Sequence, residues 1–349
     1  MKILVSALET SSNIHLKELH KYLDDDIELV GIFDKTLGTP TYDISAMAVM
    51  GFVDAFKKLP FFLKLKKEML ALAANVDKIL LMDNSAFNLP LAKAIKKQYP
   101  NKQIIYYILP QAWAWKQKRI PIIEQNCDTL CSILPFEQNY YTQKNKINYV
   151  GHPLLDEITT FKTEIISNNK IAFMPGSRRG EISKLLPIYK ELVKNYLQDK
   201  EAILIIPPHF TDEYIKELYG NLDEFTVSRN TYETLVDVEF AFICSGTATL
   251  EAALIGTPFI LNYIAKPFDY FIAKNIVKLN YIGLANIFFE KMGKEPIHKE
   301  YIQNSVNVSN LLEGYKNIDT KEFLNNSKLL REYLKHGSSK IVAEILNYK

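Results

Sequence analysis

Short apolar runs, each about the length of one strand, alternate along this chain with longer stretches whose apolar residues recur at helical spacing. In the first half, helical spacing marks residues 14–23 and 86–97, and the apolar runs are residues 2–7, 28–33, 76–82, 103–109 and 129–134. This alternation predicts an α/β protein whose strands form a parallel sheet covered by helices on both faces.

The pattern starts again after a polar stretch at residues 163–169. The second set of apolar runs is residues 170–174, 202–206, 238–243 and 259–263, with helical stretches at 181–196 and 247–254. A chain of 349 residues is long enough for two domains, so we expect Rossmann-like domains at 1–162 and 163–320 and further helices at 321–349. Doubly wound sheets bind ligands at the carboxyl ends of their strands, so we expect the two domains to face a ligand-binding cleft.

The overall charge and the cysteine count exclude several classes of protein. Lys and Arg number 42 against 40 Asp and Glu, so no bulk basicity argues for a nucleic-acid partner. The three cysteines, Cys127, Cys131 and Cys244, are too few for a disulfide framework, which favours a reducing, cytosolic compartment. We expect no signal peptide and no transmembrane helix, because no apolar stretch reaches the length that either would need.

A glycine-containing turn at residues 173–181 joins a predicted strand to a predicted helix. Gly176 allows a ligand to approach the backbone closely, and Arg178 or Arg179 can bind phosphate oxygens in a bidentate manner. The helix N-terminus adds free N–H groups and a partial positive charge. These features suit a pyrophosphate. The alternative is an ordinary turn in which Glu181 compensates the helix dipole. The turn is not a P-loop, because it lacks the Gly-Lys-Ser/Thr ending.

A second turn of this kind, at residues 244–254, places three hydroxyl residues around one glycine: Ser245, Gly246, Thr247 and Thr249. Glu251 lies one turn into the helix that follows, where its carboxylate can accept hydrogen bonds from ribose hydroxyls. The alternative is a plain N-cap at Thr247 followed by a buried helix face. Two such turns in one half favour a nucleotide diphosphate site without a metal, since the six histidines show no HExxH pattern.

In the first half, polar residues follow two of the predicted strands. Glu9 follows the first strand, and Asp83 and Ser85 follow the strand at 76–82. Since the carboxyl ends of parallel strands meet at one edge of a sheet, Asp83 and Glu9 are candidates for a general base. The same segments can also cap helices, through Asp83 or Ser85 at one helix and Asn13 at the other, and the sequence leaves both readings open.

Two further stretches suit a lipid or sugar ligand. Residues 109–119 contain both tryptophans, Trp113 and Trp115, beside basic residues, a combination that fits a sugar ring and a phosphate. Residues 47–72 interleave apolar residues with lysines, so they can rest on an anionic bilayer or cover an acyl chain. The alternatives are a hydrophobic edge with a solvated basic face, and an amphipathic helix packed on the core.

Six sequence blocks, taken in order and with their spacing, point to one family. They are MAVMGF at 47–52, QAWAW at 111–115, ILPFE at 133–137, VGHPLLD at 150–156, PGSRRGE at 175–181 and SGTATLEAAL at 245–254. With these blocks the chain resembles the lipid-A-disaccharide synthase family from Met1 to about Gln303.

The resemblance implies a GT-B fold, in which two Rossmann-like domains face a cleft and a C-terminal helix returns to the first domain. It implies an inverting hexosyltransferase that uses no metal and no cofactor. Such an enzyme joins UDP-2,3-diacylglucosamine to 2,3-diacylglucosamine 1-phosphate (lipid X) and releases UDP and lipid A disaccharide 1-phosphate. It further implies a Gram-negative bacterium and a cytoplasmic enzyme that is peripheral on the cytoplasmic face of the inner membrane.

The residues that match the family's motifs fall into three expected sets. The catalytic set is Asp83 and Glu9; the acceptor or lipid set is Ser11, Met50, Phe52, Trp113 and Trp115; the donor (UDP) set is Gly176, Ser177, Arg178, Glu181, Ser245, Gly246, Thr247, Ala248, Thr249, Glu251 and Asn286. Residues 268–272 are a second expected contact for the acyl chains.

The chain also departs from the family pattern. Its first loop reads Leu8-Glu9-Thr10-Ser11-Ser12-Asn13 where Gly-Glu-Ala-Ser-Gly-Asp is usual, Ala86 replaces a second acidic residue, and residues 31–46 are shorter than usual. We expect a divergent, active member. The alternatives are another GT-B enzyme such as a UDP-GlcNAc epimerase, and a nucleotide-sugar-binding homologue without catalysis. The acyl-chain length, the identity of the base and the oligomeric state, for which a homodimer is one option, stay open.

Overall fold

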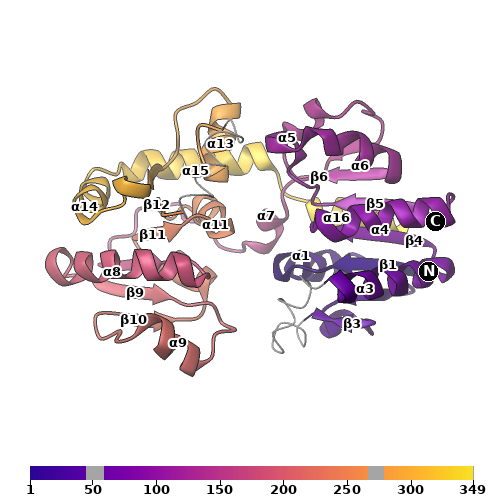
Figure 1. The fold of residues 1–349 in the computed structure, drawn as a ribbon. Coiled ribbons are helices and arrows are strands. Elements are labelled where there is room, and N and C mark those ends of the chain that lie inside the picture. Colours follow the sequence, from indigo (N-terminus) through magenta and orange to yellow (C-terminus); the bar gives the residue numbers. More distant parts are fainter. Residues whose placement is uncertain (45–58, 266–278, 349) are drawn as a thin grey trace. The chain divides into compact units, whose positions relative to one another are not determined.

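The computed structural model describes residues 1–44, 59–265 and 279–348 (Figure 1). Its contacts divide the chain into two compact units. Unit 1 comprises Met1–Glu157 together with Leu334–Lys349, and unit 2 comprises Ile158–Tyr333. The last segment of the chain therefore belongs to the same unit as the first.

Unit 1 is built on a seven-stranded parallel sheet with the order β3-β2-β1-β4-β5-β6-β7. The order changes direction between β1 and β4, as in doubly wound folds. The elements of unit 1 are β1 (Lys2–Ala7), α1 (Thr10–His20), β2 (Glu28–Phe33), η1 (Lys35–Leu37), β3 (Tyr42–Asp43), α3 (Leu59–Leu72), η3 (Ala73–Asn75), β4 (Lys78–Met82), α4 (Ser85–Gln98), β5 (Gln103–Tyr107), α5 (Ala112–Trp115), η4 (Gln117–Arg119), α6 (Ile120–Asn126), β6 (Thr129–Ser132), η5 (Glu137–Tyr140), β7 (Ile147–Tyr149), α7 (Pro153–Glu157) and α16 (Ser338–Asn347).

Each face of this sheet has its own hydrophobic core, because alternate residues of a strand point to opposite faces. Ile79 and Leu81 of β4 belong to a buried cluster with side chains of α3, α4 and α6. Leu80 and Met82 belong to a second buried cluster with side chains of α1 and α16. Burial on both faces explains why residues 79–82 of this strand are all apolar.

The C-terminal helix α16 is fixed to unit 1 at both of its ends. Asp156 of α7 accepts hydrogen bonds from the N–H groups of Gly337 and Ser339 at the helix start, each at 2.7 Å. Lys78 of β4 donates from its buried ammonium to the carbonyl of Leu346, at 3.1 Å, and to two neighbouring carbonyls at the helix end. Each charge has the sign that the helix dipole favours at that end.

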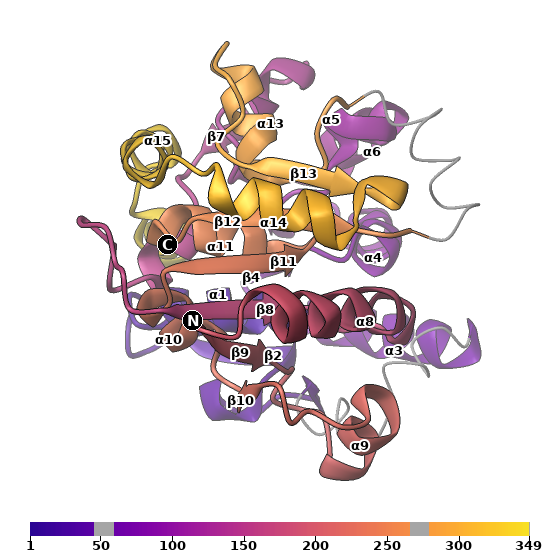
Figure 2. The same cartoon turned by 90° about the vertical axis from the view of Figure 1, so that its left-hand side faces the viewer.

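Unit 2 is built on a six-stranded parallel sheet with the order β10-β9-β8-β11-β12-β13. Figure 2 shows these strands in sequence from β13 at the top to β10 at the bottom. The elements are β8 (Lys170–Met174), α8 (Arg179–Tyr196), β9 (Glu201–Ile205), α9 (Asp212–Tyr219), β10 (Thr226–Ser228), α10 (Thr231–Asp237), β11 (Phe240–Cys244), α11 (Thr247–Ile255), β12 (Phe259–Tyr263), α13 (Leu284–Lys291), β13 (Lys299–Ile302), η6 (Gln303–Ser305), α14 (Val308–Lys316) and α15 (Thr320–Leu334).

Aromatic rings fill the core of unit 2 at the centre of its sheet. Phe173 of β8 and Phe242 of β11 stack with their centroids 5.2 Å apart. Tyr189 of α8 lies against Phe173 at 5.3 Å. These fully buried rings tie α8 to the two strands from which the glycine-containing turns leave.

The prediction of two α/β units with parallel sheets is confirmed. The sequence patterns missed the strands at the sheet edges, namely β3, β7, β10 and β13, which have only two to four residues each. The expected first domain extends to residue 162, whereas the unit boundary follows Glu157. The helices of residues 321–349 are also expected to pack on the first domain; α16 does so, whereas α15 falls almost wholly in unit 2. Among the described residues, no helix is both long and apolar enough to cross a bilayer.

Candidate active site

The two glycine-containing turns of unit 2 leave neighbouring strands. β8 and β11 pair in parallel, with Met174 opposite Ile243, so both turns start side by side at the carboxyl edge of the sheet. The strand order changes direction at this point, which is where doubly wound sheets bind ligands. The turns also pack directly, because Cys244 Sγ lies 3.2 Å from the position that a Cβ would take on Gly176.

The first turn requires glycine at position 176. Gly176 has a φ of +98°, in the left-handed region that favours glycine, and a Cβ there would lie 2.5 Å from Glu181 Oε2. The Glu181 carboxylate accepts hydrogen bonds from the N–H of Arg178, at 3.3 Å, and from Arg178 Nη1, at 2.9 Å. The Arg178 side chain is 78% exposed. Its remaining N–H groups and the exposed Ser177 therefore face solvent beside the start of α8.

The second turn leaves its backbone open at Gly246. No atom lies within 4 Å of the position that a Cβ would take there. Thr249 is buried and donates its hydroxyl to Gly246 O at 2.7 Å, so it shapes the turn from inside. The other expected donor residues of this turn are exposed or half-buried: Ser245, Thr247, Ala248 and Glu251.

The charges at the two turns suit an anion. Arg178 and Arg179 lie at the start of α8, where Arg178 pairs with the buried Glu181 and Arg179 pairs with the exposed Glu217. Burial raises the pKa of the Cys244 thiol to about 12, so this side chain is neutral at pH 7. Within the parts of the chain that the structure describes, no group of three or more His, Cys, Asp or Glu could hold a metal ion. Arginine and backbone N–H groups are the anion ligands that these turns offer.

Asn286 lies inside unit 2, in the first turn of α13, and is fully buried. Its amide donates to His298 O and to Glu300 Oε1, both at 2.9 Å, and accepts the His298 N–H at 3.2 Å. Glu300 also accepts the N–H groups of Ile282, at 2.9 Å, and Gly283, at 3.0 Å. Asn286 therefore joins α13 to β13, and its expected contact with a nucleotide stays a prediction.

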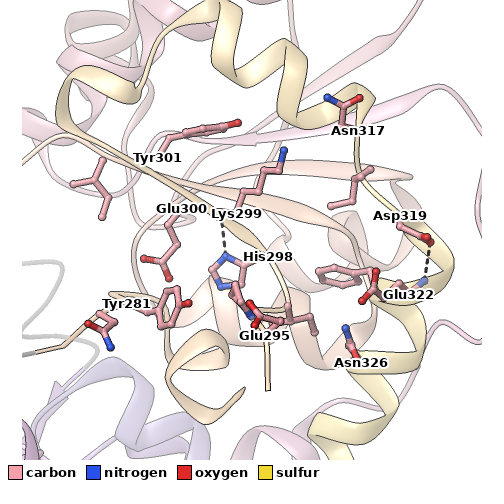
Figure 3. Close-up of a pocket in the computed structure, with 16 residues that line it drawn as sticks. Tyr281, Glu295, His298, Lys299, Glu300, Tyr301, Asn317, Asp319, Glu322 and Asn326 are labelled. Carbon is pink, nitrogen blue, oxygen red and sulfur yellow. Dashed lines mark hydrogen bonds between the residues drawn. The ribbon is translucent and has the colours of Figure 1, made fainter. Parts of the chain in front are cut away.

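A pocket of about 540 Å³ lies beside β13, the edge strand of unit 2 (Figure 3). Its lining includes residues 295–298, which precede β13, the whole of β13 and the connection from α14 to α15. Its charged lining residues are one lysine and four carboxylates: Lys299, Glu295, Glu300, Asp319 and Glu322. These carboxylates repel a diphosphate, which favours the two glycine-containing turns as the donor site.

In unit 1 the turns that follow β1 and β4 also leave neighbouring strands. Ala7 at the end of β1 lies opposite Met82 at the end of β4. Asn84 Nδ2 donates to Glu9 Oε1 at 2.7 Å. The structure therefore joins the two segments that carry the candidate bases, Glu9 and Asp83, which are far apart in the sequence.

The turn after β4 has an unusual backbone. Asp83 and Asn84 have φ values of +49° and +29°, conformations that strain residues other than glycine and that cluster at functional sites. Burial raises the pKa of Asp83, and the nearby Glu9 carboxylate raises it further. An aspartate with a raised pKa is a better proton acceptor near neutral pH. Asn84 caps α4 through the Phe87 N–H at 3.2 Å, a role that the sequence assigned to Asp83 or Ser85.

The predicted cap at Asn13 is also wrong, because α1 begins earlier than its apolar spacing indicates. Asn13 lies within α1, where its side chain donates to the carbonyls of Ala7, at 2.8 Å, and Glu9, at 2.9 Å. It also accepts the Asp34 N–H at 2.8 Å. Asn13 therefore holds the Glu9 turn against the sheet, and Ser11 lies half-buried in the first turn of the helix.

Sequence reasoning missed a histidine–carboxylate pair in this unit. His15 Nδ1 contacts Glu157 Oε1, and both side chains are largely buried. The nearby His15 lowers the pKa of Asp83, in the direction opposite to the effect of burial. His15 and Glu157 are 142 positions apart, so no local sequence signal could have joined them.

Only some of the expected acceptor residues lie in the part of the chain that the structure describes. Trp113 is 3% exposed, and its ring packs edge-on against Phe136 with a centroid distance of 4.9 Å. The stacking on a sugar that we expect from the sequence would need this ring to be uncovered. Trp115 belongs to α5. Met50, Phe52 and residues 268–272 lie outside the described residues.

Comparisons with known proteins agree on one family. The sequence model of the family described as lipid-A-disaccharide synthetase matches residues 3–347. The lipid-A-disaccharide synthase of Helicobacter pylori (strain G27) is 48% identical over 352 residues, covering 98% of this chain and 96% of that protein. The lipid-A-disaccharide synthase of Campylobacter jejuni (strain RM1221) is 47% identical over 368 residues, with 99% and 98% covered.

Solved structures with a similar fold have much lower identity. The UDP-GlcNAc 2-epimerase from Neisseria meningitidis bound to UDP-GlcNAc matches with a TM-score of 0.59 and 12% identity, over 100% of both chains. CalG4, the calicheamicin glycosyltransferase, matches with a TM-score of 0.60 and 10% identity, over 99% of this chain and 97% of that one. This likeness confirms the expected GT-B fold. Together with the match along nearly the whole sequence, it leads to one conclusion: the chain belongs to the lipid-A-disaccharide synthase family and is a glycosyltransferase of lipid A biosynthesis.

Proposed function

We propose that this enzyme transfers 2,3-diacylglucosamine from its UDP-linked donor to 2,3-diacylglucosamine 1-phosphate (lipid X), with inversion at the donor's anomeric carbon. The products are UDP and lipid A disaccharide 1-phosphate. The observation that carries the proposal is the pair of glycine-containing turns at the neighbouring carboxyl ends of β8 and β11, which suits a nucleotide diphosphate. Family membership supports the sugar-nucleotide and lipid substrates.

Unit 2 binds the donor in this proposal. Arg178, oriented by Glu181, binds phosphate oxygens, and the N–H groups at the starts of α8 and α11 receive the remaining negative charge. The open backbone at Gly246 admits the diphosphate, and Glu251 accepts hydrogen bonds from the ribose. Charge builds on UDP as the glycosidic bond breaks, and the same groups stabilise it.

Unit 1 binds the acceptor and supplies the base. The primary hydroxyl oxygen of the acceptor bonds to the donor's anomeric carbon while the bond from that carbon to the UDP oxygen breaks. The hydroxyl proton passes to Asp83, and the electron pair of the broken bond leaves with UDP. Glu9, held by Asn84, is the second candidate for the same proton. This reaction needs one base and no covalent sugar–enzyme intermediate.

The acyl chains of both substrates need shelter from water. On α3, Leu63 is 50% exposed and lies beside the exposed Lys64, while Phe61 and Phe62 pack on the core. A helix that exposes apolar and basic side chains together suits an anionic membrane surface. We therefore place the enzyme in the cytoplasm, peripheral on the inner membrane. A failure to co-sediment with anionic vesicles at low salt would count against this location.

The direct test uses the purified protein with UDP-2,3-diacylglucosamine and lipid X, followed by mass spectrometry. UDP and the tetraacyl disaccharide 1-phosphate should form only when both substrates are present. UDP-GlcNAc alone should give no epimer by NMR. An epimer, or no disaccharide with both substrates, would reject the proposed reaction.

The donor site has its own test. Arg178→Ala should weaken UDP binding about tenfold or more in calorimetry, since a hydrogen bond between charged groups is lost. Arg229→Ala is the matched control, because Arg229 pairs with Asp212 elsewhere in unit 2. Equal UDP affinities of the two variants would remove Arg178 from the donor site.

A further inference from the structure

Arg119 reaches from one turn of unit 1 to another. It ends η4, in the segment that follows β5, and its Nη1 donates to Ser85 Oγ at 2.9 Å. Ser85 is the first residue of α4 and lies two positions after Asp83. Since β4 and β5 are parallel neighbours, Arg119 stands at the same carboxyl edge of the sheet as the candidate base.

The charge of Arg119 has no protein counter-ion in the described structure. Its side chain is half-buried, and among the described residues no carboxylate lies within 4.0 Å of the guanidinium. The other arginines of the chain have ionic or aromatic partners: Arg178 with Glu181, Arg179 with Glu217, Arg229 with Asp212, and Arg331 over the Phe161 ring. A partly desolvated cation is normally paired, so Arg119 has capacity for an anionic ligand.

At this edge of the sheet the turns after β4 and β1 carry the acidic candidate bases, Asp83 and Glu9, whereas the helix α4 has no acidic residue. The first turn of α4 carries no acidic residue, and Ala86, its second residue, is exposed. Ser85 accepts one N–H of the guanidinium, which orients the planar group, and the described residues accept no second hydrogen bond from it. A guanidinium held in this way matches two oxygens of a phosphate monoester.

We propose that Arg119, positioned by Ser85, binds the 1-phosphate of the acceptor sugar. This inference rests on the proposed function, in which unit 1 binds the acceptor and Asp83 takes the proton of its primary hydroxyl. The Cα atoms of Asp83 and Ser85 lie at most about 7 Å apart, a separation comparable with the length of one hexose, so the proposal has a single sugar contact both the Asp83 turn and the Ser85–Arg119 pair. The phosphate then fixes which hydroxyl of the sugar meets the base.

The test compares Arg119→Met with Lys118→Met, a matched control that removes an exposed cation from the same η4 segment. Each variant is assayed with lipid X and with 2,3-diacylglucosamine that lacks the phosphate. R119M should raise the KM for lipid X about tenfold or more, and K118M should stay within about twofold. With the phosphate-free acceptor, R119M should match the wild type. Arg119→Lys should recover part of the loss, because it restores the charge without the planar fork.

Several results would overturn the inference. One is an R119M variant that behaves like K118M, or that raises the KM equally for both acceptors. Another is a loss of UDP affinity in calorimetry, which would assign Arg119 to the donor. A third is a loss of co-sedimentation with anionic vesicles at unchanged KM, which would assign it to membrane headgroups. Thermal melting of each variant separates all of these from unfolding.

Failure of the proposed function is distinguishable from failure of this inference. If the wild type transfers to neither acceptor, the proposed function has failed, and glucosamine 1-phosphate then serves as an NMR probe. Shifts at the amides of Ser85 and Ala86 that occur in the wild type and vanish in R119M support the phosphate site. No shifts in the wild type overturn it.

Discussion

Replacing Glu137 by Gln should remove a pH dependence from the stability of unit 1. Glu137 is 1% exposed at the start of η5, and its Oε2 lies 2.6 Å from Ser132 Oγ. Its Oε1 is buried and has no hydrogen-bond partner among the described residues. Burial raises the pKa of Glu137 from 4.5 to about 8, against the opposing effect of Ser132. At pH 7 the folded protein therefore holds a neutral acid, whereas the unfolded chain holds a carboxylate.

The sign and size of the effect follow from these two pKa values. Below pH 4.5 the group is protonated in both states, and its contribution to stability is complete. As the pH rises, the unfolded chain releases the proton first, so the free energy of unfolding falls until the pH passes about 8. The two values correspond to a loss of about 3–5 kcal/mol over this range. Gln is uncharged throughout, so E137Q should match the wild type near pH 5 and exceed it at pH 9.

Tryptophan fluorescence in urea can follow this unit separately. Both tryptophans, Trp113 and Trp115, belong to unit 1, so their signal reports the unfolding of that unit. Glu124→Gln is a control in which the pKa shift has the opposite sign. Burial raises the pKa of Glu124, but hydrogen bonds from residues 142 and 143 lower it by more, so the net shift is downward. E124Q should destabilise at neutral pH. A parallel loss of stability in the wild type and E137Q between pH 5 and 9 would refute the reasoning.

Three further perturbations test other parts of the structure. Lys78→Met should lower the free energy of unfolding of unit 1 by about 1–3 kcal/mol, because the last carbonyls of α16 lose a buried hydrogen-bond donor. An unchanged urea midpoint in the fluorescence assay would contradict this role of Lys78. Gly176→Ala should lower the stability of unit 2 by about 1–3 kcal/mol, because alanine strains the backbone there and its Cβ contacts Glu181. Gly246→Ala should change the stability by less than about 0.5 kcal/mol, because the position of its Cβ is open. Equal shifts of the melting temperature in circular dichroism would contradict this difference. Asp83→Asn should reduce turnover about 100-fold or more with unchanged UDP affinity in calorimetry, and full turnover would remove Asp83 from the role of base.

The sequence alone determined which segments become the central strands. Apolar runs such as residues 2–7 and 170–174 match β1 and β8, because strands buried on both faces need apolar residues at most of their positions. Edge strands such as β3 and β13 have few residues and less burial, so their patterns are weak. The glycine-containing turns were also readable, since a positive φ at Gly176 leaves a residue-type signature.

Only the tertiary structure decided which of these segments contact one another and how the contacts change the protonation of their side chains. Strand order brings Asn84 to Glu9, Arg119 to Ser85 and His15 to Glu157, contacts that no local spacing encodes. Burial then decides protonation, because the cost of desolvating a charge depends on the neighbours that the fold supplies. Glu137 therefore reads in the sequence as an ordinary acid, and it becomes a neutral one only inside unit 1.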